Sequence, residues 1–133
     1  MANHILLLDG SAPARMLGSS LLKASHYDVS VAATLKEASG LLRDTPCDVV
    51  LATLRDCTPS KMMSGLRDSR IVLPGDQAPL VLILDPDATP ERRLEALTAG
   101  ARDVIATPVA DLLLLARLRG VLREANGLRE VER

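Results

Sequence analysis

Five short runs of apolar residues alternate along the chain with segments of helical periodicity, and this alternation constrains the fold more than any other feature. Each run has the length of one strand and is almost continuously apolar, except 28–32, where apolar residues recur with a period of two. Such runs are typical of a parallel sheet that helices cover on both faces. The runs are ILLL (5–8), DVSVA (28–32), DVVLAT (48–53), LVLIL (80–84) and DVIA (103–106).

Residues that start or end helices stand between these runs. Thr34 and Glu37 have the spacing of a capping box, which satisfies free amides at a helix start. Thr89 followed by Pro90 marks another helix start, and Gly100 marks its end. We also predict helices after Ser11, over 60–68 and from Asp111, with an irregular segment at 70–79. In the first of these helices, the residues at helical spacing are Met16, Leu17, Ser20, Leu21 and Ala24.

Five strand–helix units predict an α/β fold with three layers, in which helices flank one five-stranded parallel sheet. A chain of 133 residues fits one such domain. Five units favour the doubly wound, flavodoxin-like strand order 2-1-3-4-5, and sites in such folds form at the carboxyl ends of the strands. We therefore expect site residues at Asp9, Gly10 and Thr53, with Leu84, Asp85 and Thr107 nearby.

Composition excludes several classes of function. The formal net charge is -1, and no long like-charge run attracts nucleic acid or a membrane surface. Neither a membrane-spanning stretch nor a signal peptide is visible, so we predict a cytoplasmic location. The chain has one tyrosine and no other aromatic residue, which removes the stacking platforms of single-strand binders. Cys47 and Cys57 flank one predicted strand at opposite ends, so we expect two free thiols.

Four stretches of the sequence carry a resemblance to a known family. They are ILLLDG, DVVLAT, APLVLIL and LTAGARDVIATPV, the last of which leads from an Ala-Gly-Ala turn through a short strand to a residue before proline. On these motifs, residues 4 to about 124 resemble the receiver domain (CheY-like) of bacterial two-component response regulators. The resemblance implies a cis peptide bond between Thr107 and Pro108, at the place where the family has a lysine before the proline.

The resemblance also implies where the parts of a phosphorylation site should stand. A working receiver domain needs carboxylates for Mg²⁺ and an aspartate to accept the phosphoryl group, whose oxygens a lysine and a hydroxyl stabilise. Of these parts, only the first carboxylate, Asp9, keeps its residue type. We therefore predict a degenerate pseudo-receiver with no bound Mg²⁺ and no other cofactor. The acidic pair falls on Asp9 and Gly10, the acceptor on Thr53, the switch hydroxyl on Leu84, the reporting aromatic on Val104 and the lysine on Thr107.

Two alternatives stay open. An acidic pocket displaced from the usual position would make the chain an active phosphoacceptor, with Asp9 as a weak metal ligand. Against this, such acidic residues are common at turns and caps. The second alternative is a flavodoxin-like small-ligand binder that holds an anion on the amides of Gly10 and Ser11, although no glycine-rich fingerprint is present. The acidic pocket would combine Asp9, Asp56, Asp85 and Asp87, and its acceptor would be Asp9, Asp56 or Asp85.

The last segment predicts a helix that continues past the end of the sheet. Its apolar residues recur at steps of four and three, as in a coiled coil. We therefore divide the chain into a receiver-like domain, 1–124, and a helical extension, 125–133, that leads toward an output domain outside this sequence. Output domains of receivers that resemble this one include diguanylate cyclases. The stripe consists of Leu114, Leu118, Val121, Ala125 and Leu128.

We predict that this chain is not an enzyme and acts by contact with its own output domain, another protein or a second copy. The contact would use the fourth helix, fifth strand and fifth helix, or the extended last helix. Neither nucleic acid nor a membrane is an expected partner. The predicted interface residues are Arg92, Arg93, Arg117, Leu118 and Arg119.

Overall fold

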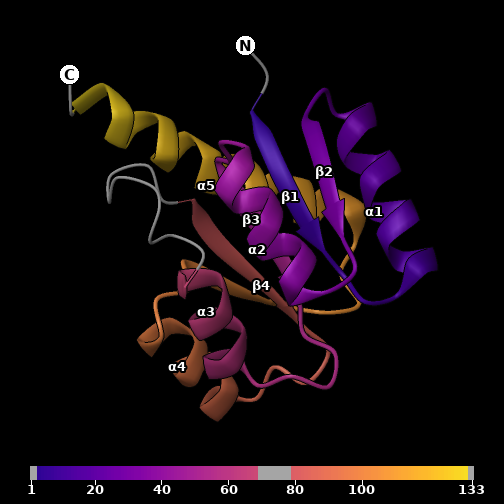
Figure 1. Cartoon of the computed structure of the whole chain (residues 1–133), viewed down its shortest axis with the longest axis vertical. Helices are drawn as coiled ribbons and strands as arrows, with labels where there is room; N and C mark the ends of the chain where they lie inside the picture. The colour runs from indigo at the N-terminus through magenta and orange to yellow at the C-terminus, as the bar shows by residue number, and fades with distance from the viewer. Residues whose placement is uncertain (1–2, 69–78, 132–133) are drawn as a thin grey trace.

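The computed structural model describes residues 3–68 and 79–131, with the backbone alone described at residue 68 and over 125–131. Its centre is a parallel sheet of five strands in the order β2-β1-β3-β4-β5 (Figure 1). This confirms the predicted fold class and strand order, with each strand within one residue of its predicted bounds. The predicted irregular segment at 70–79 lies almost entirely outside the described residues. The strands are β1 (His4–Leu8), β2 (Asp28–Ala32), β3 (Val49–Thr53), β4 (Leu80–Asp85) and β5 (Asp103–Ala106).

Helices cover both faces of the sheet (Figure 1). Each face has its own hydrophobic core. Leu22 of α1 and Leu118 of α5 pack on one face, together with Ile5 and Leu82 of the strands. Ala38 of α2, Met63 of α3 and Ala96 of α4 pack on the other face. The helices are α1 (Ala12–Ala24), α2 (Leu35–Asp44), α3 (Pro59–Asp68), α4 (Pro90–Thr98) and α5 (Asp111–Val131).

The predicted helix starts are confirmed by their hydrogen bonds. The Ser11 hydroxyl accepts from the Ala14 amide at 3.4 Å, and the Thr89 hydroxyl accepts from the Arg92 amide at 3.2 Å. The Thr34 hydroxyl accepts from the Glu37 amide at 3.1 Å, as in a capping box. These bonds satisfy amides that the first turn of a helix leaves without a partner.

Helix α1 forms as predicted, but its orientation differs from the predicted apolar pattern. Met16 and Leu17 are 71% and 73% exposed. The side that faces the sheet carries Gly18 and the buried Leu22 instead. A Cβ atom at Gly18 would lie 3.0 Å from Cδ2 of Leu7, so the absence of a side chain lets the helix approach the sheet closely.

Helix α5 runs without a break through the predicted domain boundary at residue 124, and the division of the chain there stays a prediction. It begins shortly after the Thr107–Pro108 peptide bond, which is cis as the resemblance implies. Over residues 3–68 and 79–131, no helix is both long enough and apolar enough to cross a membrane.

Gly65 and Gly40 lie inside helices with opposite surroundings, so we expect opposite effects of alanine. A Cβ atom at Gly65 would lie 2.1 Å from Cδ2 and 2.8 Å from Cγ of Leu35, whereas a Cβ atom at Gly40 has no heavy atom within 4 Å. Gly65→Ala should lower the free energy of unfolding by about 1 kcal/mol through overpacking between α2 and α3. Gly40→Ala should raise it by about 0.5–1 kcal/mol. Urea denaturation followed by circular dichroism measures both, and stabilisation by both substitutions would contradict the close contact.

Cys47 and Cys57 are free thiols, as predicted, but only Cys47 is buried. Burial is the main cause that raises the pKa of the Cys47 thiol to about 12. Because thiolate is the reactive form, iodoacetamide at pH 8 should modify Cys57 and leave Cys47 intact, as intact mass will show. An unfolded thiol ionises above 9.0 while the folded one stays protonated up to about 12, so stability should decline as pH rises through this window. Equal labelling of both cysteines in the folded protein would contradict this prediction.

Candidate functional site

The carboxyl ends of the strands meet at one edge of the sheet, as the fold predicts. Thr53 of β3 pairs with Leu84 of β4, and Asp85 pairs with Ala106 of β5. Among the side chains that the structure describes, the buried polar ones are Asp9, Thr53 and Asp85. All three stand at this edge, which makes it the candidate functional site.

Asp9 follows β1 and is held by an arginine from the loop after β3. Its Oδ1 atom accepts from Nε of Arg55 at 2.7 Å and from the Ser11 amide at 2.9 Å. Its Oδ2 atom accepts from Nη2 of Arg55 at 3.4 Å. This hydrogen-bonded carboxylate raises the pKa of the Arg55 guanidinium above its ordinary value. Asp9 therefore holds the turn that leads into α1 and neutralises Arg55.

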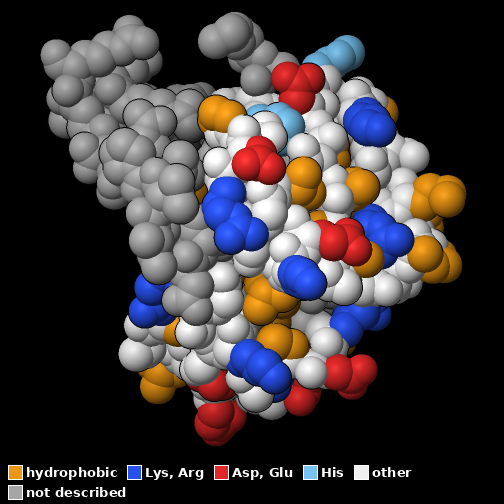
Figure 2. Space-filling view, in the orientation of Figure 1, with side chains coloured by type: hydrophobic (Ala, Val, Ile, Leu, Met, Phe, Trp, Pro, Cys, Tyr) orange, Lys and Arg blue, Asp and Glu red, His pale blue; other side chains and the backbone are white. Residues whose placement is uncertain are grey.

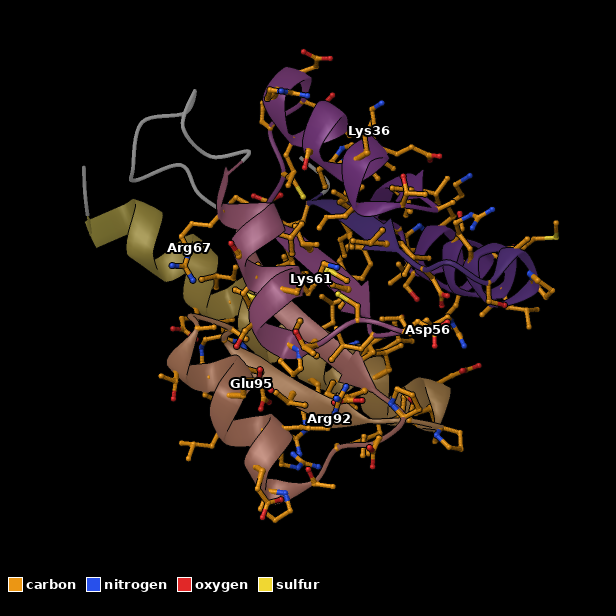
Figure 3. All side chains as sticks on the ribbon, turned by 60° about the horizontal axis from the view of Figure 1, so that its bottom comes forward. Lys36, Asp56, Lys61, Arg67, Arg92 and Glu95 are labelled. Carbon is orange, nitrogen blue, oxygen red and sulfur yellow. The ribbon has the colours of Figure 1, made fainter. Side chains whose placement is uncertain are left out.

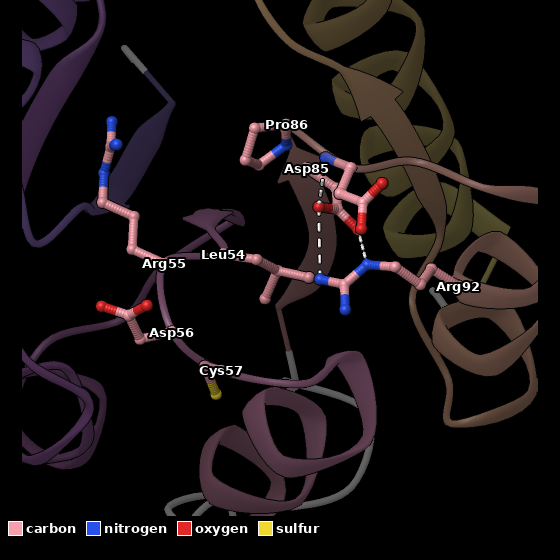
Figure 4. A pocket seen from close by; sticks show the side chains of 8 residues that line it. Leu54, Arg55, Asp56, Cys57, Asp85, Pro86 and Arg92 are labelled. Carbon is pink, nitrogen blue, oxygen red and sulfur yellow. Dashed lines mark hydrogen bonds and ion pairs between the residues drawn. The ribbon is translucent and has the colours of Figure 1, made fainter.

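Asp85 ends β4 and is held by an arginine of α4. Its Oδ2 atom accepts from Nε of Arg92 at 2.8 Å, and its Oδ1 atom accepts from Nη2 of the same side chain at 3.2 Å (Figure 4). The Asp87 amide donates to Oδ1 at 2.9 Å. This two-point pairing is the strong geometry for an arginine and a carboxylate. It raises the pKa of Arg92 above its ordinary value.

An open hollow of about 450 Å³ lies between the two arginine pairs. Asp56 and Arg92 lie at the same end of the molecule, the carboxyl edge of the sheet (Figure 3). Asp56 has a φ of 53°, the left-handed region that turns the loop after β3. No buried side-chain nitrogen or oxygen in the described part of the chain lacks a hydrogen-bond partner, so no orphaned polar atom points into the hollow. Its lining consists of Leu54, Arg55, Asp56, Cys57, Asp85, Pro86, Asp87 and Arg92 (Figure 4).

The positions that the resemblance assigned to phosphorylation do not all reach this hollow. Thr53 lies at the edge as expected, and Gly10 is exposed. Leu84 and Val104 are buried in the two hydrophobic cores, so neither lines the hollow. Of the two residues expected near the site from β4, Leu84 and Asp85, the structure places Asp85 in the lining of the hollow.

The carboxylates of the alternative acidic pocket are not arranged as a metal site. Within the described residues, no group of three or more histidine, cysteine or acidic side chains is placed to hold a metal ion. Asp9 and Asp85 each bond an arginine instead of each other or a shared site. A guanidinium thus stands against each buried carboxylate at the place where a cation would bind.

The predicted interface residues lie in different surroundings. Arg92 belongs to the site, and Arg93 donates to the carbonyl oxygens of Ala88 and Val104 at 3.2 and 3.1 Å. Arg117 pairs with Asp103 at 3.0 Å on the surface, and Arg119 is exposed. The prediction for Leu118 is wrong, because it is 0% exposed and packs in the core beneath α5.

Comparison with solved structures gives the same arrangement. A receiver domain protein (CheY-like) from Methanospirillum hungatei JF-1 matches with a TM-score of 0.81 over 96% of this chain and 98% of that chain. The chain has the fold of response regulator receiver domains. The chemotaxis protein CheY4 of Vibrio cholerae also matches, with a TM-score of 0.79 over 91% of this chain and 99% of that chain. Sequence identities to these two receiver structures are 22% and 23%.

Sequence comparison finds a similar regulatory protein. The regulatory protein VirG of Rhizobium rhizogenes is 27% identical over 121 residues, which cover 91% of this chain and 48% of VirG. The chain therefore spans about half the length of this curated relative. No protein-family model matches the chain.

Two site residues of this receiver fold were not found by sequence reasoning. Arg55 was not singled out, and Arg92 was assigned to a protein interface instead of the carboxyl edge. Arg55 stands two residues after the strand-end Thr53, and Arg92 stands seven residues after Asp85. Arg55 therefore lies on the connection after β3, and Arg92 lies on the connection after β4. This closeness to the strand ends is the feature of the sequence that could have indicated both arginines.

Proposed function

We propose that this chain is a pseudo-receiver, a cytoplasmic regulatory domain that acts through protein contact without phosphorylation. The observation that carries the proposal is the pairing of both buried carboxylates of the site with arginines. Asp9 bonds Arg55 and Asp85 bonds Arg92, each through two nitrogen atoms.

The chemistry of these pairs argues against phosphoryl transfer. Mg²⁺ takes oxygen ligands at short distances and repels a guanidinium that occupies the same carboxylate. Each arginine supplies the positive charge that the buried carboxylate needs, so no divalent ion is required for neutralisation. Thr53 stands at the acceptor position, where a neutral hydroxyl cannot ligate Mg²⁺ as a carboxylate does and is not ionised near pH 7 without a base.

The remaining surfaces fit a domain that works by contact. Arg119 is exposed on α5, and Leu94 and Leu112 on α4 and α5 are 67% and 82% exposed. One candidate partner is an output domain of the same protein. Receivers that resemble this chain have output domains that include diguanylate cyclases. A second copy of the chain is another.

Incubation with acetyl phosphate and Mg²⁺ tests the proposal. We expect intact mass to stay unchanged, and we expect isothermal titration with Mg²⁺ to show no binding at the site. The matched control is a Gly10→Asp, Thr53→Asp, Thr107→Lys variant, which restores the acidic pair, the acceptor and the lysine. The addition of one phosphoryl mass to the unaltered chain through a base-labile acyl linkage would overturn the proposal and favour the active phosphoacceptor, with Asp9, Asp56 or Asp85 as the acceptor to be mapped.

A further inference from the structure

Helix α4 has less apolar contact with the rest of the domain than the other helices have. Within α4, all of which the structure describes, one residue is buried, and it is Ala96. Each of the other helices buries at least one leucine or methionine. Leu94 and Leu97 of α4 are 67% and 48% exposed, and apolar side chains lie on the surface at the lower left of Figure 2, where α4 runs. Because the free energy of burial scales with apolar area, apolar packing holds α4 only weakly.

Two consecutive arginines connect the start of α4 to the sheet. Arg92 bonds Asp85 at the end of β4 through two nitrogen atoms. Arg93 contacts the next strand of the sheet instead. Its Nε atom donates to the carbonyl oxygen of Ala88 at 3.2 Å, and its Nη1 atom donates to that of Val104 at 3.1 Å. Arg93 therefore joins the loop before α4 to β5.

Helix α3 supplies two further hydrogen bonds, to the middle and the end of α4. The Ser60 hydroxyl donates to Oε1 of Glu95 at 2.8 Å. The Nη2 atom of Arg67 donates to the carbonyl oxygen of Ala99, the residue that caps the end of α4. Arg67 lies on α3, and Glu95 and Arg92 lie along α4 (Figure 3). The hydrogen bonds that hold α4 thus come from β4, β5 and α3.

We propose that these side-chain hydrogen bonds fix α4 in one position, and that Arg93 is the positioning residue that ties it to β5. Apolar contacts have no preferred direction and tolerate a shift of the helix along the sheet. Hydrogen bonds weaken steeply when their angles change, so a shift of α4 would break several of them together. The domain then presents one constant α4 surface to any protein that contacts it. The inference goes beyond the proposed function, because it concerns how the domain holds a helix.

Hydrogen exchange of single amides in an Arg93→Met variant, followed by NMR, tests the proposal. Methionine keeps an apolar stem at this position and removes both bonds to carbonyl oxygens. We expect the amides of α4 to exchange about tenfold faster than in the unaltered chain, because local opening of the helix then breaks fewer bonds. Amides of β3, at the centre of the sheet, should keep their rates. Relaxation dispersion should detect μs–ms motion of α4 in the variant and none in the unaltered chain.

An Arg117→Met variant is the matched control. Arg117 also ties a helix to β5, through its ion pair with Asp103. Helix α5, however, buries Leu118, Val121 and Leu122, so apolar packing holds it in place. The exchange rates of α5 amides in this variant should therefore change by less than about twofold, as expected for loss of an exposed ion pair.

Four results would overturn the proposal. The first is an unchanged exchange rate of the α4 amides in the Arg93→Met variant. The second is an equal acceleration in α4 and β3, which would show a loss of global stability. The third is μs–ms motion of α4 in the unaltered chain, and the fourth is an equal acceleration of α5 amides in the Arg117→Met control. Phosphoryl uptake from acetyl phosphate would overturn the proposed function without changing the exchange rates of the unphosphorylated chain, so the two failures are distinguishable.

Discussion

Replacement of Leu118 by alanine is expected to lower the free energy of unfolding by about 3 kcal/mol. Leu118 is 0% exposed and packs between α5 and the sheet, in the same core as Ile5, Leu82 and Ile105. Truncation removes buried methyl groups and leaves a cavity that the strands cannot fill, because parallel strands are fixed by their hydrogen-bond ladders. Urea denaturation measures the change, and the melting temperature should fall by roughly 10 °C.

The neighbouring residue Arg119 provides the control for this substitution. It is exposed on the same helix, so Arg119→Ala should change the free energy of unfolding by less than about 0.5 kcal/mol. The comparison separates a core role for Leu118 from the interface role that the sequence alone predicted. A Leu118→Ala protein as stable as the unaltered chain would contradict the core role.

Replacement of Arg92 by methionine is expected to cost about 2 kcal/mol. Asp85 is 1% exposed, and the substitution leaves its carboxylate buried with a single hydrogen bond from the Asp87 amide. Removal of one partner of a fully buried pair costs about 3–5 kcal/mol, and the 26% exposure of Arg92 reduces that cost. The double variant Asp85→Asn, Arg92→Met should be more stable than Arg92→Met, because it removes the unpaired charge.

The surface pair of Arg117 and Asp103 is the matched comparison. These side chains are 55% and 33% exposed, so Arg117→Met should cost less than about 1 kcal/mol, and the cost should disappear in high salt. The cost of Arg92→Met should persist in the same salt. Denaturation midpoints of both variants with and without 1 M NaCl measure these costs. If salt reduced the two costs equally, the pair of Arg92 and Asp85 would be screened by solvent as strongly as the surface pair, which would contradict the prediction.

The location of the site was predictable from the sequence because backbone topology sets it. Asp9 follows one apolar run and Thr53 ends another. Parallel strands bring such positions to one edge of the sheet. The contents of the site were less predictable. Leu84 and Asp85 are adjacent in sequence, and alternate residues of a strand point to opposite faces. Which of the two enters the hollow depends on how β4 sits against its helices, and that choice belongs to tertiary packing.

The same limit applies to the helices. The spacing of apolar residues predicted helices at α1 and α5, yet Met16 and Leu17 face outward and Leu118 faces the core. Gly18 decides the orientation of α1, because its missing side chain allows contact with Leu7. A helix with apolar residues on several sides has more than one face that could pack inward, and the shape of the sheet selects among them.

The sequence by itself determined the strands, their order, the helix starts and the edge at which the site forms. These follow from local periodicity, capping chemistry and the handedness of strand–helix–strand connections. Only the tertiary structure decided that Arg55 and Arg92 reach back to Asp9 and Asp85. Arg55 follows β3 whereas Asp9 follows β1, and Arg92 lies on α4, seven residues after Asp85. A long flexible side chain reaches a carboxylate only where the packed backbone brings the two within hydrogen-bond distance. Burial of each carboxylate then makes the pairing favourable, because an unpaired charge there would be costly.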